Sequence, residues 1–463
     1  MRAGIERSEI TIVGGGLVGS LLAILLSRRG HAVTVHERRS DLREGPVEAG
    51  RSINLVATRR GIRALERVGL AERALALSVP VYGRMVHAAT GALAFQPYGR
   101  DRTECNHSIS RGALNEFLVR EAVAQGVRFR FESKLVDADL ARGRLTFEGP
   151  SAGRRDEVHA RVVFGADGAG SAVRAALAHV PGFAESIEPL GHAYKELDIP
   201  PADGGGFRIE RNALHVWPRG EFMLMALPNP DGNFTVTLYL PERGPHGFDR
   251  MDTPARVAAL FGEHFADAAA LIPDVTTAFF DRPTGTLGTV RCLPWRSGDR
   301  ALVLGDAAHA IVPFFGQGMN CGFEDCTVLD ELLDDGAGGW GEVFEEFERR
   351  RKPDADAIAD MAIENFLEMR DRVGDALFLL RKQVEHRLEV EMPREYRSRY
   401  SMVMYSHIPY RTAMDVGAVQ QSILDELCRD LGSADDLDVD RARRLVGDRL
   451  APHLRERGVS LDY

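Results

Sequence analysis

The sequence lacks the cysteine patterns of disulfide-rich and zinc-binding proteins. It has five cysteines, and none of them belongs to a CxxC pair or to a Cys/His cluster with zinc spacing: Cys105, Cys292, Cys321, Cys326 and Cys428. We therefore expect reduced thiols, as in a cytosolic protein.

Long hydrophobic runs and an excess of positive charge are also missing. The most apolar run, residues 17–26, contains Gly19 and Ser20 and follows a strand-like segment rather than a basic one. It is much shorter than the ~20 residues that a membrane-spanning helix needs. The 58 basic and 68 acidic side chains give a net charge of -10, which repels phosphate backbones. We expect a cytoplasmic protein with neither a membrane nor a nucleic acid as partner.

What the sequence does contain is an ordinary globular composition and an ordered series of structural patterns. Of its 463 residues, 44% are hydrophobic and 27% are charged, which allows two or three domains. The order begins with strand, helix and strand over residues 9–37. It becomes β-rich from about Tyr194 to Leu240 and almost wholly helical from about Phe323. This order predicts an α/β (mixed α+β) fold in which a β-rich domain is inserted into a discontinuous nucleotide-binding domain.

A glycine motif lies between the first strand and the first helix. Gly14, Gly16 and Gly19 form GxGxxG, and Glu37 ends the next strand. The first glycine permits a tight turn, the second lets the backbone approach a pyrophosphate, and the third allows close packing of helix on strand. The helix N-terminus would attract the phosphates, and Glu37 would accept bonds from ribose hydroxyls. A tight turn in another α/β fold and an NAD-dependent dehydrogenase are the alternatives at this point.

Two aspartates stand at the ends of two further strands. Asp167 lies in FGADGAGSAVR, and Asp306 lies in GDAAH. A carboxylate there can bind a polyol hydroxyl in the crevice above a sheet. Taken alone, each is more typical of a helix cap or a turn.

Together, these three motifs resemble the FAD-dependent aromatic hydroxylases. More specific segments resemble the kynurenine 3-monooxygenase family over nearly the whole chain to about residue 410: GRSINL (50–55), GRMVH (83–87), QPYGR (96–100), YKELDI (194–199), ALHVWP (213–218), VPFFGQGMN (312–320), ENFLEM (364–369) and RYSMV (399–403). The tail departs from the membrane-bound members, because DLDVDRARRLVGDRLAPHLRERG is charged. The chain therefore resembles a bacterial, soluble form.

The resemblance implies a division of the chain. A Rossmann-type FAD-binding domain would comprise residues 1–80, 100–180 and 285–330. A β-sheet substrate domain would comprise residues 81–99 and 181–284, followed by a C-terminal helical region over residues 331–463.

The resemblance also implies the cofactor site. Asp306 would hold the ribityl hydroxyls of bound FAD, and the helix beginning near Gly318–Asn320 would point its positive end at the flavin. The full set of implied FAD contacts is Gly14, Gly16, Leu17, Val18, Gly19, Glu37, Arg38, Leu55, Arg111, Val136, Asp167, Asp306, Gly318, Met319 and Asn320.

The substrate site is implied in the same way. Four residues would bind the carboxylate of an amino-acid head group: Arg84, Tyr98, Asn365 and Tyr400. Six apolar or aromatic residues would form the wall around the ring: Leu214, Val216, Leu227, Tyr239, Pro313 and Phe314. Without the resemblance, the Arg is more typical of an ion pair, and the other residues of ordinary packing.

The reaction implied is hydroxylation of L-kynurenine to 3-hydroxykynurenine through a flavin 4a-hydroperoxide, with NADPH and O2 consumed. No second GxGxxG is present, so NADPH would be a transient co-substrate without a domain of its own. The aniline amine activates the ring, so no catalytic base is assigned, and we expect a structural role for His309 and packing for Cys321. A homodimer is a possible assembly.

Three other functions fit parts of the sequence. The first is a hydroxylase of a related tryptophan- or anthranilate-derived aromatic. The second is a flavin-dependent halogenase, although Trp217 is followed directly by Pro218 and the halogenase W-x-W-x-I-P motif is missing. The third is a non-enzymatic FAD-binding protein.

Overall fold

The computed structural model describes residues 7–44, 54–150, 154–336, 338–371 and 376–461, so residues 50–53 of GRSINL lie outside the described residues. The chain forms two compact units. The first unit comprises Met1–Ser78, Ser108–His192 and Pro283–Ala359. The second comprises Val79–His107, Ala193–Arg282 and Asp360–Tyr463.

A six-stranded sheet forms the centre of the first unit. Its order is β18 (Arg296–Ser297), β19 (Ala301–Val303), β12 (Val162–Gly165), β1 (Glu9–Val13), β2 (Ala32–His36) and β8 (Arg128–Arg130). All neighbours are parallel except β18 and β19. The apolar runs of β1, β12 and β19 are buried, as expected for strands covered on both faces.

Helices pack on this sheet because burial of their apolar faces against it removes apolar surface from water. Helix α1 (Leu17–Arg28) packs against α4 (Arg111–Ala124) and α10 (Gly318–Asp334), and α10 packs against α2 (Arg59–Arg67). Gly30 has φ +85° just after α1, in the left-handed conformation expected of a glycine that ends a helix. The shorter elements are β3 (Leu55–Ala57), α3 (Ala71–Leu75), α5 (Ala172–Ala176), η1 (Leu177–His179), β17 (Thr284–Leu293), α9 (Asp306–His309) and η3 (Pro313–Phe315).

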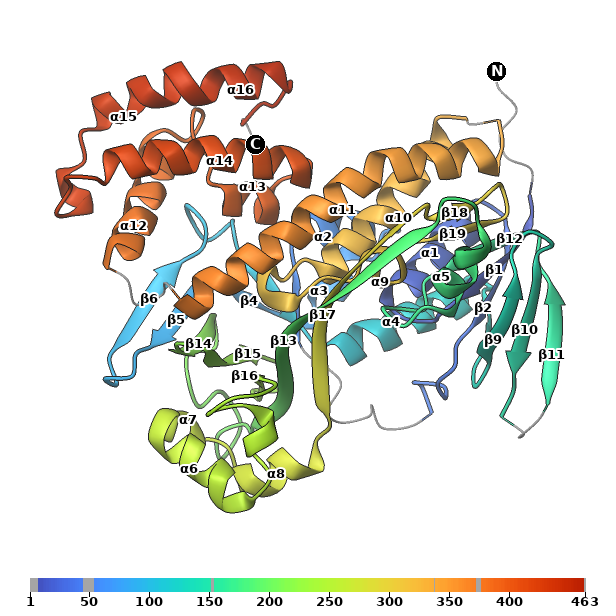
Figure 1. The fold of residues 1–463 in the computed structure, drawn as a ribbon, viewed down its shortest axis with the longest axis horizontal. Coiled ribbons are helices and arrows are strands. Elements are labelled where there is room, and N and C mark those ends of the chain that lie inside the picture. The colour runs from blue at the N-terminus through green and yellow to red at the C-terminus, as the bar shows by residue number, and fades with distance from the viewer. Residues whose placement is uncertain (1–6, 45–53, 151–153, 337, 372–375, 462–463) are drawn as a thin grey trace. The chain divides into compact units, whose positions relative to one another are not determined.

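A small antiparallel sheet also belongs to the first unit (Figure 1). It contains β11 (Arg155–His159), β10 (Arg144–Glu148) and β9 (Lys134–Asp139), in that order.

The second unit is built on a larger sheet. The sheet has seven strands, in the order β17, β13 (Ala184–Ile199), β16 (Phe234–Pro241), β15 (Phe222–Pro228), β14 (Ala213–Arg219), β5 (Gly83–His87) and β6 (Leu93–Pro97). Strand β17 and residues 184–192 of β13 are assigned to the first unit. One face carries Trp217, Leu224 and Leu238 and packs against three helices: α6 (Pro254–His264), α7 (Ala266–Ala269) and α8 (Val275–Asp281). These helices lie beside β15 and β16 (Figure 1).

The C-terminal part of the second unit is helical. It contains α12 (Ala376–Glu391), α13 (Arg399–Tyr405), α14 (Tyr410–Leu427), η4 (Ala434–Asp436), α15 (Val439–Leu445), η5 (Val446–Leu450) and α16 (Ala451–Glu456). The long helix α11 (Trp340–Asp371) begins in the first unit and ends in the second, and β4 (Ser78–Val81) and β7 (Asn106–Ile109) also span the division; η2 (Phe248–Arg250) precedes α6.

The mixed α/β fold and the helical C-terminal region are therefore confirmed, as is the β-rich stretch, which contains β13 to β16. The assignment of three functional domains stays a prediction. Among the described residues, no helix is both long enough and apolar enough to cross a membrane.

Candidate active site

The sequence motifs of the first unit share one edge of its sheet. Because β19, β12, β1 and β2 are parallel, their carboxyl ends meet at the same edge. The glycine turn follows β1, Glu37 follows β2, Asp167 follows β12 and Asp306 follows β19. Strands β2 and β8 lie on one side of β1, and the later strands β12 and β19 lie on its other side. The strand order therefore reverses at β1, and such a topological switch point is where open α/β sheets bind ligands.

The glycine turn has one open position and two crowded ones. A Cβ atom on Gly14 would lie 2.4 Å from the Ala166 carbonyl oxygen, and Gly14 has φ +103°. A Cβ atom on Gly19 would lie 2.0 Å from the Gly14 carbonyl oxygen. Gly16 instead faces open space. The turn thus requires glycine on its packed side and leaves its backbone approachable where a pyrophosphate would come.

Glu37 supports this turn directly. Its Oε2 accepts a hydrogen bond from the Gly15 N–H (2.7 Å), and its Oε1 accepts one from the Arg39 N–H (2.9 Å). A carboxylate has further acceptor positions for a ribose hydroxyl. Arg38 lies beside it, and Leu17 and Val18 lie in the first turn of α1, whose leading N–H groups have no acceptor within the helix.

Asp167 caps helix α5. Its carboxylate accepts from the Ser171 hydroxyl (2.5 Å) and from the N–H groups of Ala172 (2.7 Å) and Val173 (3.3 Å). Burial raises the pKa of Asp167 above its ordinary value, although these bonds oppose the rise. The capping function that its sequence context suggested is therefore present.

Asp306 is exposed at the start of the single-turn helix α9. Gly305, with φ +59°, turns the chain from β19 into this helix. Gly318 and Met319 begin α10, while the Asn320 side chain donates to the carbonyls of Val56 (2.7 Å) and Gly316 (2.9 Å). The Asn320 side chain thus fastens the helix start, and Asp306 keeps its carboxylate accessible.

The other predicted cofactor contacts also lie in the first unit. Leu55 is in β3, Arg111 is the first residue of α4 and is exposed, and Val136 is in β9. An approachable glycine turn, a helix N-terminus and an exposed strand-end carboxylate are what a dinucleotide requires, so these residues fit FAD.

The second unit contains a cavity of about 250 Å³ that all four predicted head-group residues line. Arg84 comes from β5, Tyr98 follows β6, Asn365 comes from α11 and Tyr400 from α13. Arg84 and Tyr400 are 316 positions apart in the sequence, so it is the fold that brings these residues together.

Arg84 is a cation with unused bonding capacity in this cavity. Its buried Nε has no hydrogen-bond partner within the described part of the chain. Burial disfavours its charge, but the hydroxyls of Tyr98 and Tyr400 and the Glu368 carboxylate outweigh that effect, so the pKa of Arg84 is raised. An anionic ligand would satisfy the guanidinium.

The two tyrosines form a stacked pair. Their ring centroids lie 5.4 Å apart at an interplanar angle of 28°. The Tyr400 hydroxyl accepts from Asn106 Nδ2 at 3.0 Å. Burial raises the pKa of Tyr98 and of Tyr400, so both hydroxyls keep their protons at neutral pH and can donate to a carboxylate.

Strand register places the predicted ring-wall residues of the second unit on one sheet face. Leu214 pairs with Arg84, and Val216 pairs with Met225, which pairs in turn with Thr237. Paired residues share a face, and alternation adds Leu227 and Tyr239 to it. This face is opposite the one covered by α6–α8. Pro313 and Phe314 lie in η3 of the first unit.

The cavity is also lined by residues that were not predicted as site residues, although the quoted segments QPYGR and ENFLEM include four of them. They are Phe95, Gln96, Pro97, Glu368, Met369, Phe378, Leu379, Lys382, Gln383, Glu385, His386, Glu389 and Ser398. A signal existed for two of them, because Glu368 and Met369 follow Asn365 at the i+3 and i+4 spacing of one helix face. The lining residues that belong to α12 lie on a helix without any predicted site residue, so no spacing pattern pointed to them.

Comparisons with known proteins agree with this geometry. Residues 7–362 match the family model described as FAD binding domain. A protein of Myxococcus xanthus named kynurenine 3-monooxygenase is 53% identical over 452 residues, covering 97% of each chain. A protein of the same name from Stenotrophomonas maltophilia is 45% identical, covering 93% of this chain and 94% of its own.

The chain belongs to the kynurenine 3-monooxygenase family. As a member of this family it is an FAD-dependent monooxygenase, and an aromatic hydroxylase in its broader class. The dehydrogenase, halogenase and non-enzymatic alternatives are thereby set aside. The fold agrees: a tetrameric form of 2-methyl-3-hydroxypyridine-5-carboxylic acid oxygenase superposes with a TM-score of 0.63 at 22% identity, covering 84% of this chain and 99% of that one.

Proposed function

We propose that this family member hydroxylates L-kynurenine on the ring carbon ortho to the amine and releases 3-hydroxykynurenine. NADPH would supply two electrons, and O2 would supply one oxygen atom to the ring and one to water. The names of the relatives support this substrate, as does the cavity of the second unit, in which a buried cation and two phenol donors converge.

The head group of the substrate is the part that this cavity suits. Arg84 would bind the carboxylate through its guanidinium, with the hydroxyls of Tyr98 and Tyr400 and the amide of Asn365 as further donors. The buried Nε of Arg84 is the single observation that carries the proposal, since a buried donor without an acceptor is costly until an anion arrives.

FAD, when bound by the first unit, supplies the oxygen-activating chemistry. The chain's own contribution is to hold FAD through the glycine turn, Glu37 and Asp306, and to fix the substrate through its carboxylate. The aniline nitrogen already donates electrons to the ring, so the reaction needs no protein base.

The test is a comparison of Arg84→Met and Arg84→Lys with the wild-type enzyme. We expect the KM for L-kynurenine to rise at least about 30-fold in the Met variant, because a charged hydrogen-bonding partner is lost. The Lys variant should lie between, because a point charge replaces a bidentate fork. Kynurenine-stimulated NADPH oxidation and chromatography of 3-hydroxykynurenine are the measurements.

Arg102→Met is the matched control, because Arg102 is an exposed arginine of the same unit that stacks over Tyr82 with 5.1 Å between Cζ and the ring centroid. Its KM should stay at the wild-type value. If anthranilate-type aromatics without an amino-acid head are hydroxylated and L-kynurenine is not, the related-aromatic alternative is correct and this proposal is wrong.

A further inference from the structure

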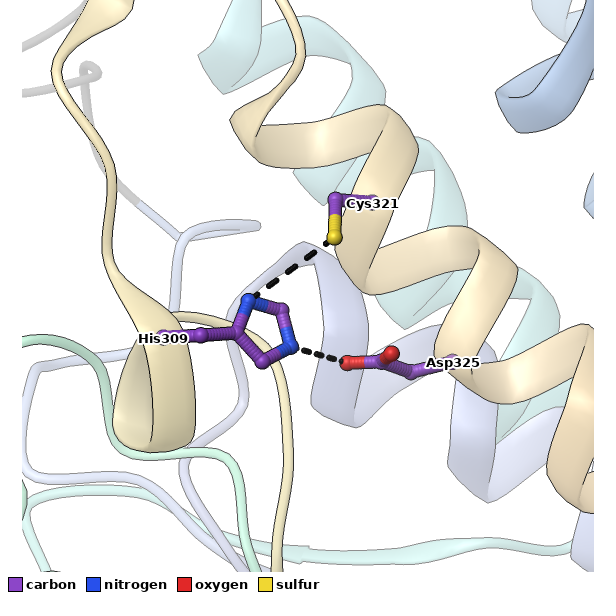
Figure 2. A group of neighbouring side chains, drawn as sticks. All are labelled: His309, Cys321 and Asp325. Atoms are coloured by element: carbon purple, nitrogen blue, oxygen red, sulfur yellow. Dashed lines mark hydrogen bonds and ion pairs between the residues drawn. The ribbon is translucent and has the colours of Figure 1, made fainter. Parts of the chain in front are cut away.

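Asp325, in the second turn of α10, is fully buried and has both carboxylate oxygens occupied. Oδ2 accepts from the Gly305 N–H (2.9 Å) and contacts His309 Nε2 (2.6 Å). Oδ1 accepts from Arg351 Nε (2.7 Å). One side chain thus ties the residue before α9, the last residue of α9 and helix α11 to helix α10. Figure 2 shows its carboxylate pointing at the His309 ring.

The neighbouring thiol makes this group look like a metal site. Ligand atoms of His309, Cys321 and Asp325 lie within 4.8 Å of one another (Figure 2). However, Arg351 Nη2 lies 3.3 Å from the Cys321 sulfur and 3.2 Å from the Cys321 carbonyl oxygen. A guanidinium in that position would repel a divalent cation, and Asp325 already has three donors. The geometry therefore favours a charged hydrogen-bond network over a metal.

Charge balance supports a protonated His309. Three basic and three acidic side chains belong to the network: Arg60, His309, Arg351, Glu324, Asp325 and Asp354. It is neutral when the imidazole is charged and Cys321 is a thiol. Burial disfavours the imidazolium, but Asp325 outweighs that effect and raises the pKa of His309 well above its ordinary value.

Helix α9 cannot hold its shape alone. It is four residues long, and the backbone bonds that close it run from the N–H groups of Ala308 and His309 to the Gly305 carbonyl (2.9 Å each). An isolated single turn is unstable in water, because helix nucleation is costly. Its geometry, and with it the direction of the exposed Asp306 carboxylate, must come from contacts outside the turn.

We propose that Asp325 is a positioning residue for FAD: by bonding Gly305 and His309 together, it fixes the turn that presents Asp306 to the cofactor. This inference rests on the proposed contact of Asp306 with the ribityl chain. Asp325 itself is too deeply buried to be that contact, so it acts through α9.

The test compares Asp325→Asn with Asp330→Asn in the apoprotein. Asp330 lies on the same helix, is also buried, and pairs with Arg29 and Arg67 rather than with α9. Titration with FAD, followed by quenching of flavin fluorescence, should give a Kd about tenfold higher or more for Asp325→Asn, because a charge-assisted bond is lost. The Kd of Asp330→Asn for FAD should stay within about twofold of the wild-type value. Within the described part of the chain Asp330 makes no hydrogen bond or ion pair with α9, and a change at a distant site without shared partners has little effect on another site.

A second readout separates positioning from general destabilisation. Amide hydrogen exchange at Gly305 and His309 should accelerate in Asp325→Asn and not in Asp330→Asn. A wild-type Kd in Asp325→Asn, or an equal loss of affinity in both variants, would overturn the proposal.

His309→Gln provides the test if Asp325→Asn does not fold. It keeps the Asp325 bond to Gly305 and removes the charged donor, so we expect a Kd about threefold higher or more; an unchanged Kd would count against the proposal. Neither measurement contains kynurenine or NADPH. Failure of the proposed substrate therefore leaves this result intact, and the reverse also holds.

Discussion

Single atoms decide which glycines of the nucleotide turn can be replaced. Gly19→Ala would place a methyl group against the Gly14 carbonyl oxygen, whereas Gly16→Ala would place one in open space. We expect Gly19→Ala to lower the free energy of unfolding of the apoprotein by about 2 kcal/mol or more, because a packed backbone contact must move. Gly16→Ala should leave apoprotein stability near wild type and weaken FAD binding, since the pyrophosphate needs that space.

The two variants are each other's control in this experiment. Urea unfolding of the apoproteins measures the first effect, and flavin fluorescence measures the second. Equal loss of apoprotein stability in both variants would show that the turn is uniformly crowded, contrary to the structure.

His36, the last residue of β2, gives the protein a specific sensitivity to acid. Its ring stacks on Phe147 with 3.8 Å between centroids, and its Nδ1 lies 2.8 Å from the Ser133 hydroxyl. Burial, with a smaller effect of Arg130, lowers the pKa of His36 to about 4. The unfolded chain takes up this proton near pH 6.5 and the native state resists it, so stability is complete above pH 6.5 and is lost as pH falls towards 4.

The expected size follows from linkage. Between pH 7 and pH 4.5, the wild type should lose about 2–3 kcal/mol more unfolding free energy than His36→Gln, at about 1.4 kcal/mol for each unit of pKa difference. Urea denaturation of both proteins at the two pH values measures the difference, and parallel losses would show that the imidazole is solvated.

At the scale of elements, the segment before α13 is held by a buried ion pair. Arg397 Nη2 donates to Glu104 Oε1 at 2.8 Å, and both side chains are largely buried. Arg397→Met should lower the unfolding free energy by about 2–3 kcal/mol, because it removes one partner of a buried pair. Arg443→Met breaks an exposed pair with Glu395 and should cost less than about 0.5 kcal/mol.

The position of the C-terminal helical region, with Tyr400 in α13, suggests the further hypothesis that this region acts as a lid over the substrate cavity, and the same contacts decide how that hypothesis should be tested. Removing everything after about residue 385 would delete Tyr400 together with Arg397, and so would damage the second unit as well as any lid. The paired point variants, assayed for thermal unfolding and for coupling of NADPH oxidation to hydroxylation, separate stability from closure. If the region acts as a lid, the Arg397→Met variant should show uncoupled NADPH oxidation even at temperatures where thermal unfolding shows that it is still folded.

The sequence predicts single elements well, but it does not predict how those elements pack against one another. The Gly14–Gly19 turn, β1, α1 and β2 follow from residues that are close in sequence, where spacing and period are visible. The Asp325 network was not visible, because Arg351 meets Asp325 26 residues later and only after α10 and α11 have packed. Burial of an ion pair depends on that packing, not on local pattern.

For the same reason, the substrate cavity was only partly foreseen. Arg84 and Leu214 pair although they are 130 positions apart in the sequence, and no periodicity in either segment predicts the parallel pairing of β5 with β14. The residues from α12 needed the helical packing of the second unit. The four head-group residues came from family resemblance, and their gathering around one cavity is a property of the fold.

At the scale of the molecule, the residues predicted to bind FAD and those predicted to bind the substrate head group lie in different units. The former lie in the first unit and the latter in the second. We expect FAD to slow amide exchange around residues 14–19 and 305–320, and L-kynurenine to slow it around residues 84–98 and 360–402. Mass-spectrometric exchange of the Arg84→Met variant is the control, since it should lose only the second effect.

The two-faced sheet of the second unit has a consequence for how this enzyme could diversify. Trp217, Leu224 and Leu238 lie in the apolar layer beneath α6–α8, whereas Leu214, Val216 and Leu227 lie on the opposite face of the sheet. Substitutions at Leu214, Val216 and Leu227 would change the opposite face and leave the packing beneath α6–α8 in place, with a cost in stability at Leu214 and Val216 because these two are themselves buried. Substrate preference can therefore change through substitutions on one face of this sheet while the packing of its other face is conserved.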